Sequence, residues 1–233
     1  MRLPFNPVER AREVENIVMK GKKRKYYRFR FARYYGGIVT ADTVGCCLLC
    51  AYCWNYFKNV HPERYGNFYS PEQVSDELTR IARERGCYTF RISGAEPILG
   101  RKSMKHIVEV IELVDSKFIL ETNGLMLGYM PELADELIGL NVAVRVTIKG
   151  WDEESFERIT GARREFFKYQ LKALEVLRER WILFWPAIMY DIFGDRGISE
   201  LRRRLGYTGY IEYEYLEKYP FVVENLRKRG IRL

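Results

Sequence analysis

Strand-like and helix-like segments alternate along this chain, and the alternation limits the folds it can adopt. Upstream, residues 7–20 have helical apolar spacing, while 25–31 and 36–40 resemble strands. Further helices are expected at 70–86, 102–114, 131–139, 152–159, 164–179, 197–204 and 219–229, and strands at 88–93, 117–122, 142–148, 182–190 and 208–214. Strands that alternate with helices predict a parallel sheet with right-handed crossovers. The sheet is then an open doubly wound one or a partial barrel.

Polar side chains on one face of the strands favour the barrel. Arg91 and Ser93 alternate with apolar residues in one strand, and Arg145 and Thr147 do so in another. Period-two alternation places each set on one face of the sheet. We therefore expect an α/β fold, a partial (β/α)6 barrel whose lumen holds the polar set, with Glu121 pairing with the arginines. The alternative is that both arginines lie near strand ends and reach solvent.

A cysteine-rich loop follows the strand expected at 36–40. Cys46, Cys50 and Cys53 have the spacing C-x3-C-x2-C, and three thiolates can hold three irons of a cubic 4Fe-4S cluster. With no fourth cysteine nearby, one iron would stay open for another ligand. We expect Cys47 to be a small bystander and Cys87 to be a core residue.

A zinc knuckle is the main alternative for this loop. Structural zinc takes four ligands and usually paired C-x2-C hooks. The two histidines of the chain, His61 and His106, do not form such a hook.

The loop and three later motifs resemble the radical S-adenosylmethionine (SAM) superfamily, and most closely the activating enzymes of glycyl-radical enzymes, of the pyruvate formate-lyase activase type. The resemblance runs from about Gly36 to Met189. Its motifs are the cysteine loop with Tyr52, then Ser93-Gly94-Ala95-Glu96-Pro97, Glu121-Thr122-Asn123-Gly124, and Thr147-Ile148-Lys149-Gly150 with the segment to Gly161. Each lies at an expected strand end, where parallel sheets bind ligands.

The resemblance implies roles for these residues. Cys46, Cys50 and Cys53 would hold the cluster, and SAM would chelate the open iron. Glu96 and the Gly94-Ala95 backbone beside Ser93 would hold the SAM amino group, and Lys149 would pair with its carboxylate. Tyr52 would lie near the adenine, and Glu121 and Thr147 would hydrogen-bond the ribose or hold a cation.

The chain departs from the family pattern at four places. Ala95 replaces a glycine, Thr147 an aspartate and Trp54 a frequent histidine, and the strand near Ile211 lacks a histidine.

The implied reaction is reductive cleavage of SAM to a 5′-deoxyadenosyl radical, which abstracts hydrogen from a substrate. An electron donor such as ferredoxin or flavodoxin would supply the electron. The leading hypothesis is an activating enzyme that acts on a partner protein. The alternatives are a radical SAM enzyme that modifies a small molecule or RNA, and a non-catalytic iron–sulfur or zinc protein.

Net charge and hydropathy indicate what surface the protein presents and where in the cell it is found. The net charge is +8, with basic residues gathered at 20–25, 202–204 and 227–229. These segments are expected to be a solvated surface, or else a contact for nucleic acid or an acidic partner. No apolar run is long enough to cross a bilayer and the first residues lack a signal core, so we expect a cytoplasmic protein. Residues 1–35 are expected to form a helix-and-strand extension, and 36–233 the barrel.

Overall fold

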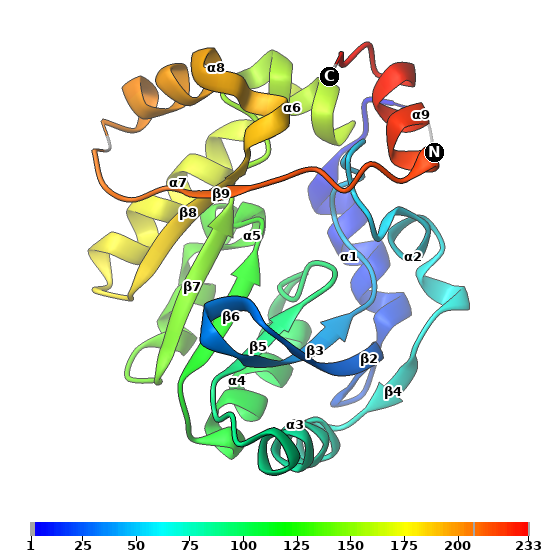
Figure 1. Cartoon of the computed structure of the whole chain (residues 1–233), viewed down its shortest axis with the longest axis vertical. Helices are drawn as coiled ribbons and strands as arrows, with labels where there is room; N and C mark the ends of the chain where they lie inside the picture. The colour runs from blue at the N-terminus through cyan, green and yellow to red at the C-terminus, as the bar shows by residue number, and fades with distance from the viewer. Residues whose placement is uncertain (1–2, 207, 233) are drawn as a thin grey trace.

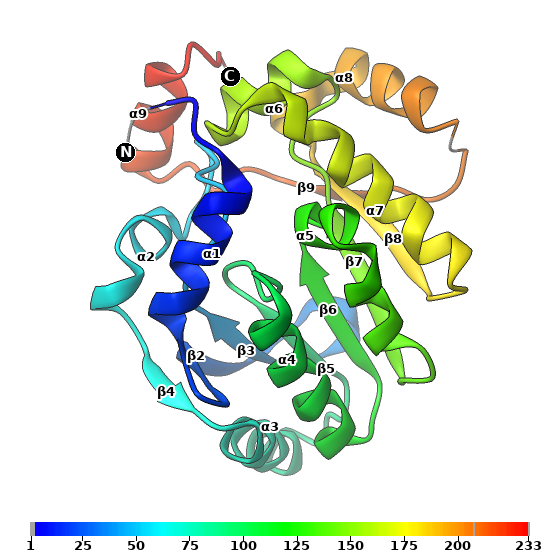
Figure 2. The same cartoon turned by 180° about the vertical axis from the view of Figure 1, so that it is seen from behind.

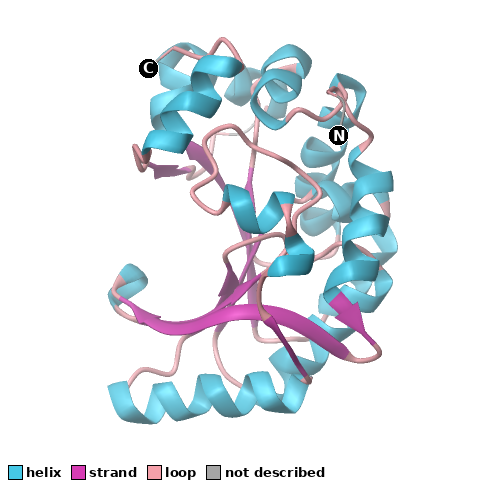
Figure 3. Cartoon of the chain, turned by 90° about the vertical axis from the view of Figure 1, so that its right-hand side faces the viewer, coloured by secondary structure: helices cyan, strands magenta, loops and turns pink. Residues whose placement is uncertain are grey.

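Six parallel strands form the centre of the protein. The structure is a computed structural model that describes residues 3–206 and 208–232; residues 1, 2, 207 and 233 of the expected domains lie outside these ranges. The strands lie side by side in the order β3 (Ile38–Thr43), β5 (Phe90–Ser93), β6 (Phe118–Thr122), β7 (Val142–Thr147), β8 (Phe184–Met189) and β9 (Glu212–Glu214). They curve around an open side (Figure 3), so the expected partial (β/α)6 barrel is confirmed.

An antiparallel extension continues the sheet beyond β3. The long strand β2 (Lys23–Ala32) pairs with β3, and the short strands β1 (Met19–Lys20) and β4 (Asn67–Tyr69) pair with β2. Helix α1 (Pro7–Val18) precedes them, and in Figure 1 the two chain ends lie near α9 (Pro220–Lys228). The first 35 residues thus join the barrel's own sheet, and the division at residue 35 stays a prediction.

Helices cover the outer face of the sheet. Figure 2 shows α4 (Arg101–Val114), α5 (Leu125–Tyr129) and α7 (Phe167–Glu179) in front of the strands. The remaining helices are α2 (Tyr56–Val60), α3 (Pro71–Arg85), α6 (Glu153–Thr160) and α8 (Tyr190–Leu205). The Ser70 hydroxyl and the Gln73 side chain cap the start of α3, and a left-handed Gly86 ends it, as its sequence predicts. Within the described ranges, no helix combines the length and apolarity that a bilayer crossing needs.

Some expected boundaries are wrong. The segment 131–139 forms a 3-10 helix over Pro131–Leu137, and helix α5 before it was not expected. Helix α8 begins at Tyr190 rather than at 197, with a bend at Gly194. Strand β5 begins only at Phe90, where pairing with β3 and β6 starts, so Cys87 is half-buried rather than a core residue.

The lumen has an apolar floor with charged side chains above it. Ala32, Ile38, Ile119 and Trp185 form a small cluster separate from the main core. Above it, Arg91 and Arg145 are 5% and 3% exposed, so the expectation that they line the lumen is confirmed and the solvent alternative is wrong.

Candidate active site

Three of the loop cysteines face one cavity at the carboxyl ends of the strands. This cysteine cavity is lined by Cys46, Cys50 and Cys53, together with Tyr52, Ser93, Gly94, Ala95, Glu96, Glu121, Thr147 and Lys149. Every residue expected at the site therefore meets the same space. The side chain of Arg10 in α1 ties the loop down, since its Nε donates to the Cys46 carbonyl at 3.0 Å.

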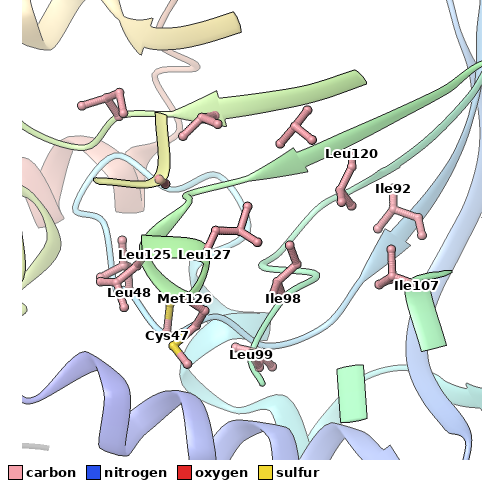
Figure 4. Packing of buried hydrophobic residues seen from close by; sticks show 14 of the residues in the cluster. Cys47, Leu48, Ile92, Ile98, Leu99, Ile107, Leu120, Leu125, Met126 and Leu127 are labelled. Atoms are coloured by element: carbon pink, nitrogen blue, oxygen red, sulfur yellow. The ribbon is translucent and has the colours of Figure 1, made fainter. Parts of the chain in front are cut away.

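The donor set fits a cluster with one open iron better than it fits structural zinc. Cys47 is fully buried in the main apolar core (Figure 4), where its sulfur accepts from the Asn123 side chain at 3.3 Å, and it does not line the cavity. His106 is buried against Tyr26, and His61 lies by Glu63. No fourth thiol or imidazole therefore lines the cavity. Across the described residues, no three Cys, His, Asp or Glu side chains are grouped closely enough to hold a single metal ion.

Burial keeps two of these thiols protonated while no metal is bound. It raises the pKa of Cys50 to about 12 and that of Cys53 to about 11. Iron binding would displace those protons, because thiolates are the ligands.

Glu96 is already engaged by the protein. Its Oε1 accepts hydrogen bonds from the Ile98 amide at 3.0 Å and the Thr122 hydroxyl at 2.6 Å, and its Oε2 from the Asn123 amide at 2.7 Å. Burial raises the pKa of Glu96 to about 7 in spite of these bonds. In this geometry the carboxyl group holds two loop segments together, which leaves the Gly94-Ala95 backbone as the better candidate for contact with a ligand.

Gly94 is required by its conformation. Its φ is +86°, and a Cβ there would lie 2.9 Å from the Asp42 Cβ. Its carbonyl accepts a hydrogen bond from the Asn55 side chain at 2.6 Å, which joins the motif to the cysteine loop. Only glycine adopts this backbone shape easily while lying so close to β3.

Glu121 pairs with the lumen arginines, as its sequence position predicts. Its Oε1 lies 2.9 Å from Arg91 and 4.0 Å from Arg145, and its Oε2 accepts from the Ser93 hydroxyl. Burial alone would raise the pKa of Glu121, but the two arginines outweigh it and hold the pKa below its usual value. Since these partners occupy both oxygens, they fix Glu121 in the wall of the cavity.

Lys149 follows the end of β7, and its Nζ lies 5.3 Å from the centre of the Tyr52 ring. No carboxylate in the described part of the chain pairs with it, so this cation is available to an anionic ligand. The neighbouring Thr147 hydroxyl faces Arg145 at 3.4 Å.

Gln170 of α7 is a positioning residue that sequence reasoning missed. It is fully buried, accepts from the Lys149 amide at 2.9 Å and donates to the Thr147 carbonyl at 3.3 Å. A glutamine among apolar helix residues was the only available signal.

A second cavity adjoins the first on the open side of the barrel. This aromatic cavity shares Tyr52, Trp54, Ser93, Glu121, Arg145, Met189 and Glu214 with the cysteine cavity. Its other walls come from β2, the turn after β2, Arg91 of β5, and β9 with the segment that follows. Sequence reasoning missed it, because β2 and β9 meet this space only after the sheet has curved.

Several residues of the basic segments are buried or paired with carboxylates. Arg24 is fully buried and donates to the Glu96 carbonyl at 2.7 Å, and Lys25 donates to the Pro62 and Glu63 carbonyls. Farther along, Arg203 and Arg204 pair with Glu200, and Arg227 and Lys228 pair with Glu224. The expectation that 20–25 is a wholly solvated surface is therefore wrong for Arg24 and Lys25.

A partial α/β barrel with three thiols at the carboxyl ends of its strands defines a class of iron–sulfur protein. The radical SAM superfamily model matches residues 40–199, most of the chain, and the protein belongs to this superfamily. The superfamily implies a 4Fe-4S cluster and SAM as the cofactors of this chain.

Relatives with similar sequences are named as cyclases. A probable GTP 3′,8-cyclase from Methanococcus maripaludis is 32% identical over 151 residues, 63% of this chain and 48% of that protein. Another from Sulfurisphaera tokodaii is 25% identical over 222 residues, 88% of this chain and 67% of that protein. The chain therefore spans about half the length of the first of these relatives.

Solved structures share the fold at low sequence identity. Streptococcus suis SuiB bound to S-adenosylmethionine has a TM-score of 0.58 at 14% identity, covering 80% of this chain and 44% of that one. Native anSMEcpe with bound AdoMet has a TM-score of 0.54 at 17% identity, covering 76% and 53%. These similarities support the barrel and carry no argument about the substrate.

Proposed function

We propose that this radical SAM enzyme abstracts hydrogen from a small molecule held in the aromatic cavity. The observation that carries the proposal is the shared wall between the two cavities. A compound in the aromatic cavity would lie directly beside the space that the three thiols face.

Cys46, Cys50 and Cys53 would hold three irons of the 4Fe-4S cluster, and SAM would lie beside it. When bound, the cluster and SAM supply a carbon-centred radical that abstracts hydrogen. Lys149 would pair with the SAM carboxylate, and the Gly94-Ala95 backbone would accept from its amino group. The protein's contribution is to orient the reactants and exclude water from them.

Two observations favour a small molecule over RNA or a partner protein. The cyclases to which the chain is similar are named for a small molecule, GTP. The ion pairs of Arg203 and Arg227 with glutamates reduce the positive charge that two of the basic segments offer to a polyanion such as RNA. Activation of a partner protein is the alternative that the motifs alone suggested. We expect ferredoxin or flavodoxin as the electron donor, and the cytoplasm as the location.

The test is anaerobic reconstitution with iron and sulfide, followed by dithionite and SAM. We expect 5′-deoxyadenosine to form, and Cys46→Ser to abolish both the cluster absorption and this product. The matched control Cys47→Ser should keep both, because Cys47 lies outside the cavity. If the wild type makes no 5′-deoxyadenosine, the proposal is wrong. A glycyl-radical signal on a co-purified protein would favour the activating-enzyme hypothesis instead.

A further inference from the structure

The aromatic cavity has many aromatic side chains exposed around it. Six aromatic residues of its lining are between 39% and 67% exposed: Tyr34, Tyr35, Trp54, Tyr213, Tyr215 and Tyr219. They come from both sides of the open barrel. Single exposed aromatic residues are common on protein surfaces, but a group around one opening marks a binding site. Their faces offer stacking surfaces for a planar ring.

The charges of this cavity are balanced. Its lining holds four arginines and four glutamates: Arg28, Arg30, Arg91, Arg145, Glu121, Glu212, Glu214 and Glu217. Asp42 lies behind this lining with no exposed side-chain surface, and it adds one further negative charge.

The arginines are already paired. Asp42 lies 2.7 Å from Arg28 and 2.8 Å from Arg30. Arg145 lies 2.8 Å from Glu212 and 3.0 Å from Glu214, and Arg91 pairs with Glu121. Phosphate recognition needs free arginine or lysine donors. A phosphorylated ligand would compete with these carboxylates for the arginines and would meet a lining that carries no excess positive charge.

One buried hydroxyl group lacks a partner. Tyr52 is 5% exposed and lines both cavities, and its hydroxyl makes no hydrogen bond in the described structure. Burying such a group without a partner is unfavourable. A polar group on a ligand at the shared wall would satisfy it.

We propose that the aromatic cavity binds a planar-ring compound of net charge near zero, such as a nucleoside or an aromatic amino acid, and disfavours its phosphorylated forms. This inference rests on the proposed function, because it names the class of substrate for that reaction. It separates this chain from relatives named for a nucleoside triphosphate.

The experiment is calorimetric titration of the cluster-loaded enzyme under anaerobic conditions with saturating SAM, so that the cysteine cavity is filled. The probes are guanosine against GTP, adenosine against ATP, and L-tryptophan. We expect at least one uncharged or zwitterionic probe to bind, and each nucleoside that binds to do so about tenfold tighter than its triphosphate. Tighter binding of the triphosphates, or no binding by any of guanosine, adenosine and tryptophan, would overturn the proposal. So would tighter binding of an oligouridylate or a peptide.

Variants separate the cavity from unspecific binding. Trp54→Ala and Tyr215→Ala should weaken binding of the ring compound about tenfold, because each substitution removes an aromatic ring on which the ligand can stack. Trp181→Ala is the matched control, since Trp181 is 95% exposed in the turn before β8, at the opposite end of that strand. Glu217→Gln removes one negative charge and should narrow the gap between guanosine and GTP about threefold. An equal shift for both compounds, or an equal loss in the Trp181 variant, would contradict the inference.

The two proposals fail separately. If binding is absent while 5′-deoxyadenosine still forms, only the substrate class is wrong. If ring compounds bind while no 5′-deoxyadenosine forms, only the proposed function is wrong.

Discussion

The stability of this fold should change little between pH 5 and 6.5, because two buried groups titrate there with opposite effects. Glu96 has its pKa raised by burial from 4.5 to about 7. His106 has its pKa lowered by burial from 6.5 to about 4. The His106 ring is held neutral between two partners: Nδ1 donates to the Lys22 carbonyl at 2.7 Å, and Nε2 accepts from the Tyr26 hydroxyl at 2.9 Å.

The signs follow from proton counts. Folded Glu96 keeps a proton that the unfolded chain releases above its ordinary pKa, so its contribution to stability falls as pH rises from about 4.5 to 7. His106 stays neutral in the folded protein at pH values where the unfolded chain binds a proton. Its contribution to the stability of the fold is therefore lost as pH falls from about 6.5 to 4. Both pKa values move by about 2.5 units (7 minus 4.5, and 6.5 minus 4), or about 3 kcal/mol each. Between pH 5 and 6.5 each group changes the free energy of unfolding by about 1.5 kcal/mol, and the two changes have opposite signs and cancel.

Removing one of the two groups should reveal the pH dependence of stability that the other group causes. In guanidinium denaturation followed by circular dichroism, Glu96→Gln should become about 1.5 kcal/mol more stable from pH 5 to 6.5, and His106→Gln about 1.5 kcal/mol less stable. Glu84→Gln and His61→Gln, at exposed or half-buried positions, are the matched controls and should keep the flat profile. A flat profile in both the Glu96 and the His106 variants would refute the reasoning, as would two slopes of the same sign.

Three further changes test other parts of the site. Glu121→Gln should lower the free energy of unfolding by about 3 kcal/mol, because Arg91 would lose its buried anionic partner; a loss below about 1 kcal/mol would show that the pair is dispensable. Gly94→Ala should lower the melting temperature by several degrees, because its Cβ would approach Asp42 at φ +86°, and an unchanged melting temperature would contradict this geometry. Lys149→Met should weaken SAM binding about tenfold in equilibrium dialysis while leaving stability unchanged, and undiminished binding would exclude Lys149 as the carboxylate partner.

Features that depend on neighbouring residues, or on the alternation of polar and apolar residues along a strand, were predicted from the sequence. The capping of α3 needs only Ser70 and Gln73, three residues apart. The lumen positions of Arg91 and Arg145 follow from alternation along single strands, and Glu121 was predicted to pair with them by the same reasoning. Such features can be predicted because they depend on residues close together in the sequence and not on distant contacts.

Features that depend on distant contacts were missed. Arg24 looks like one of several surface cations, yet its partner is the carbonyl of Glu96, 72 residues away. The start of α4 is capped by Glu15 through Ser103, 88 residues apart. The aromatic cavity likewise needs β2 and β9 to face each other, which no local pattern encodes.

The apolar floor of the lumen, formed by Ala32, Ile38, Ile119 and Trp185, has a kinetic consequence. These apolar side chains fill the lumen below the arginines, so a reactant would reach the shared wall from the strand-end side, where both cavities lie. A compound in the aromatic cavity would then cover the part of the cysteine cavity that shares its wall. We therefore expect an ordered kinetic scheme, in which SAM binds first and the products of its cleavage leave last.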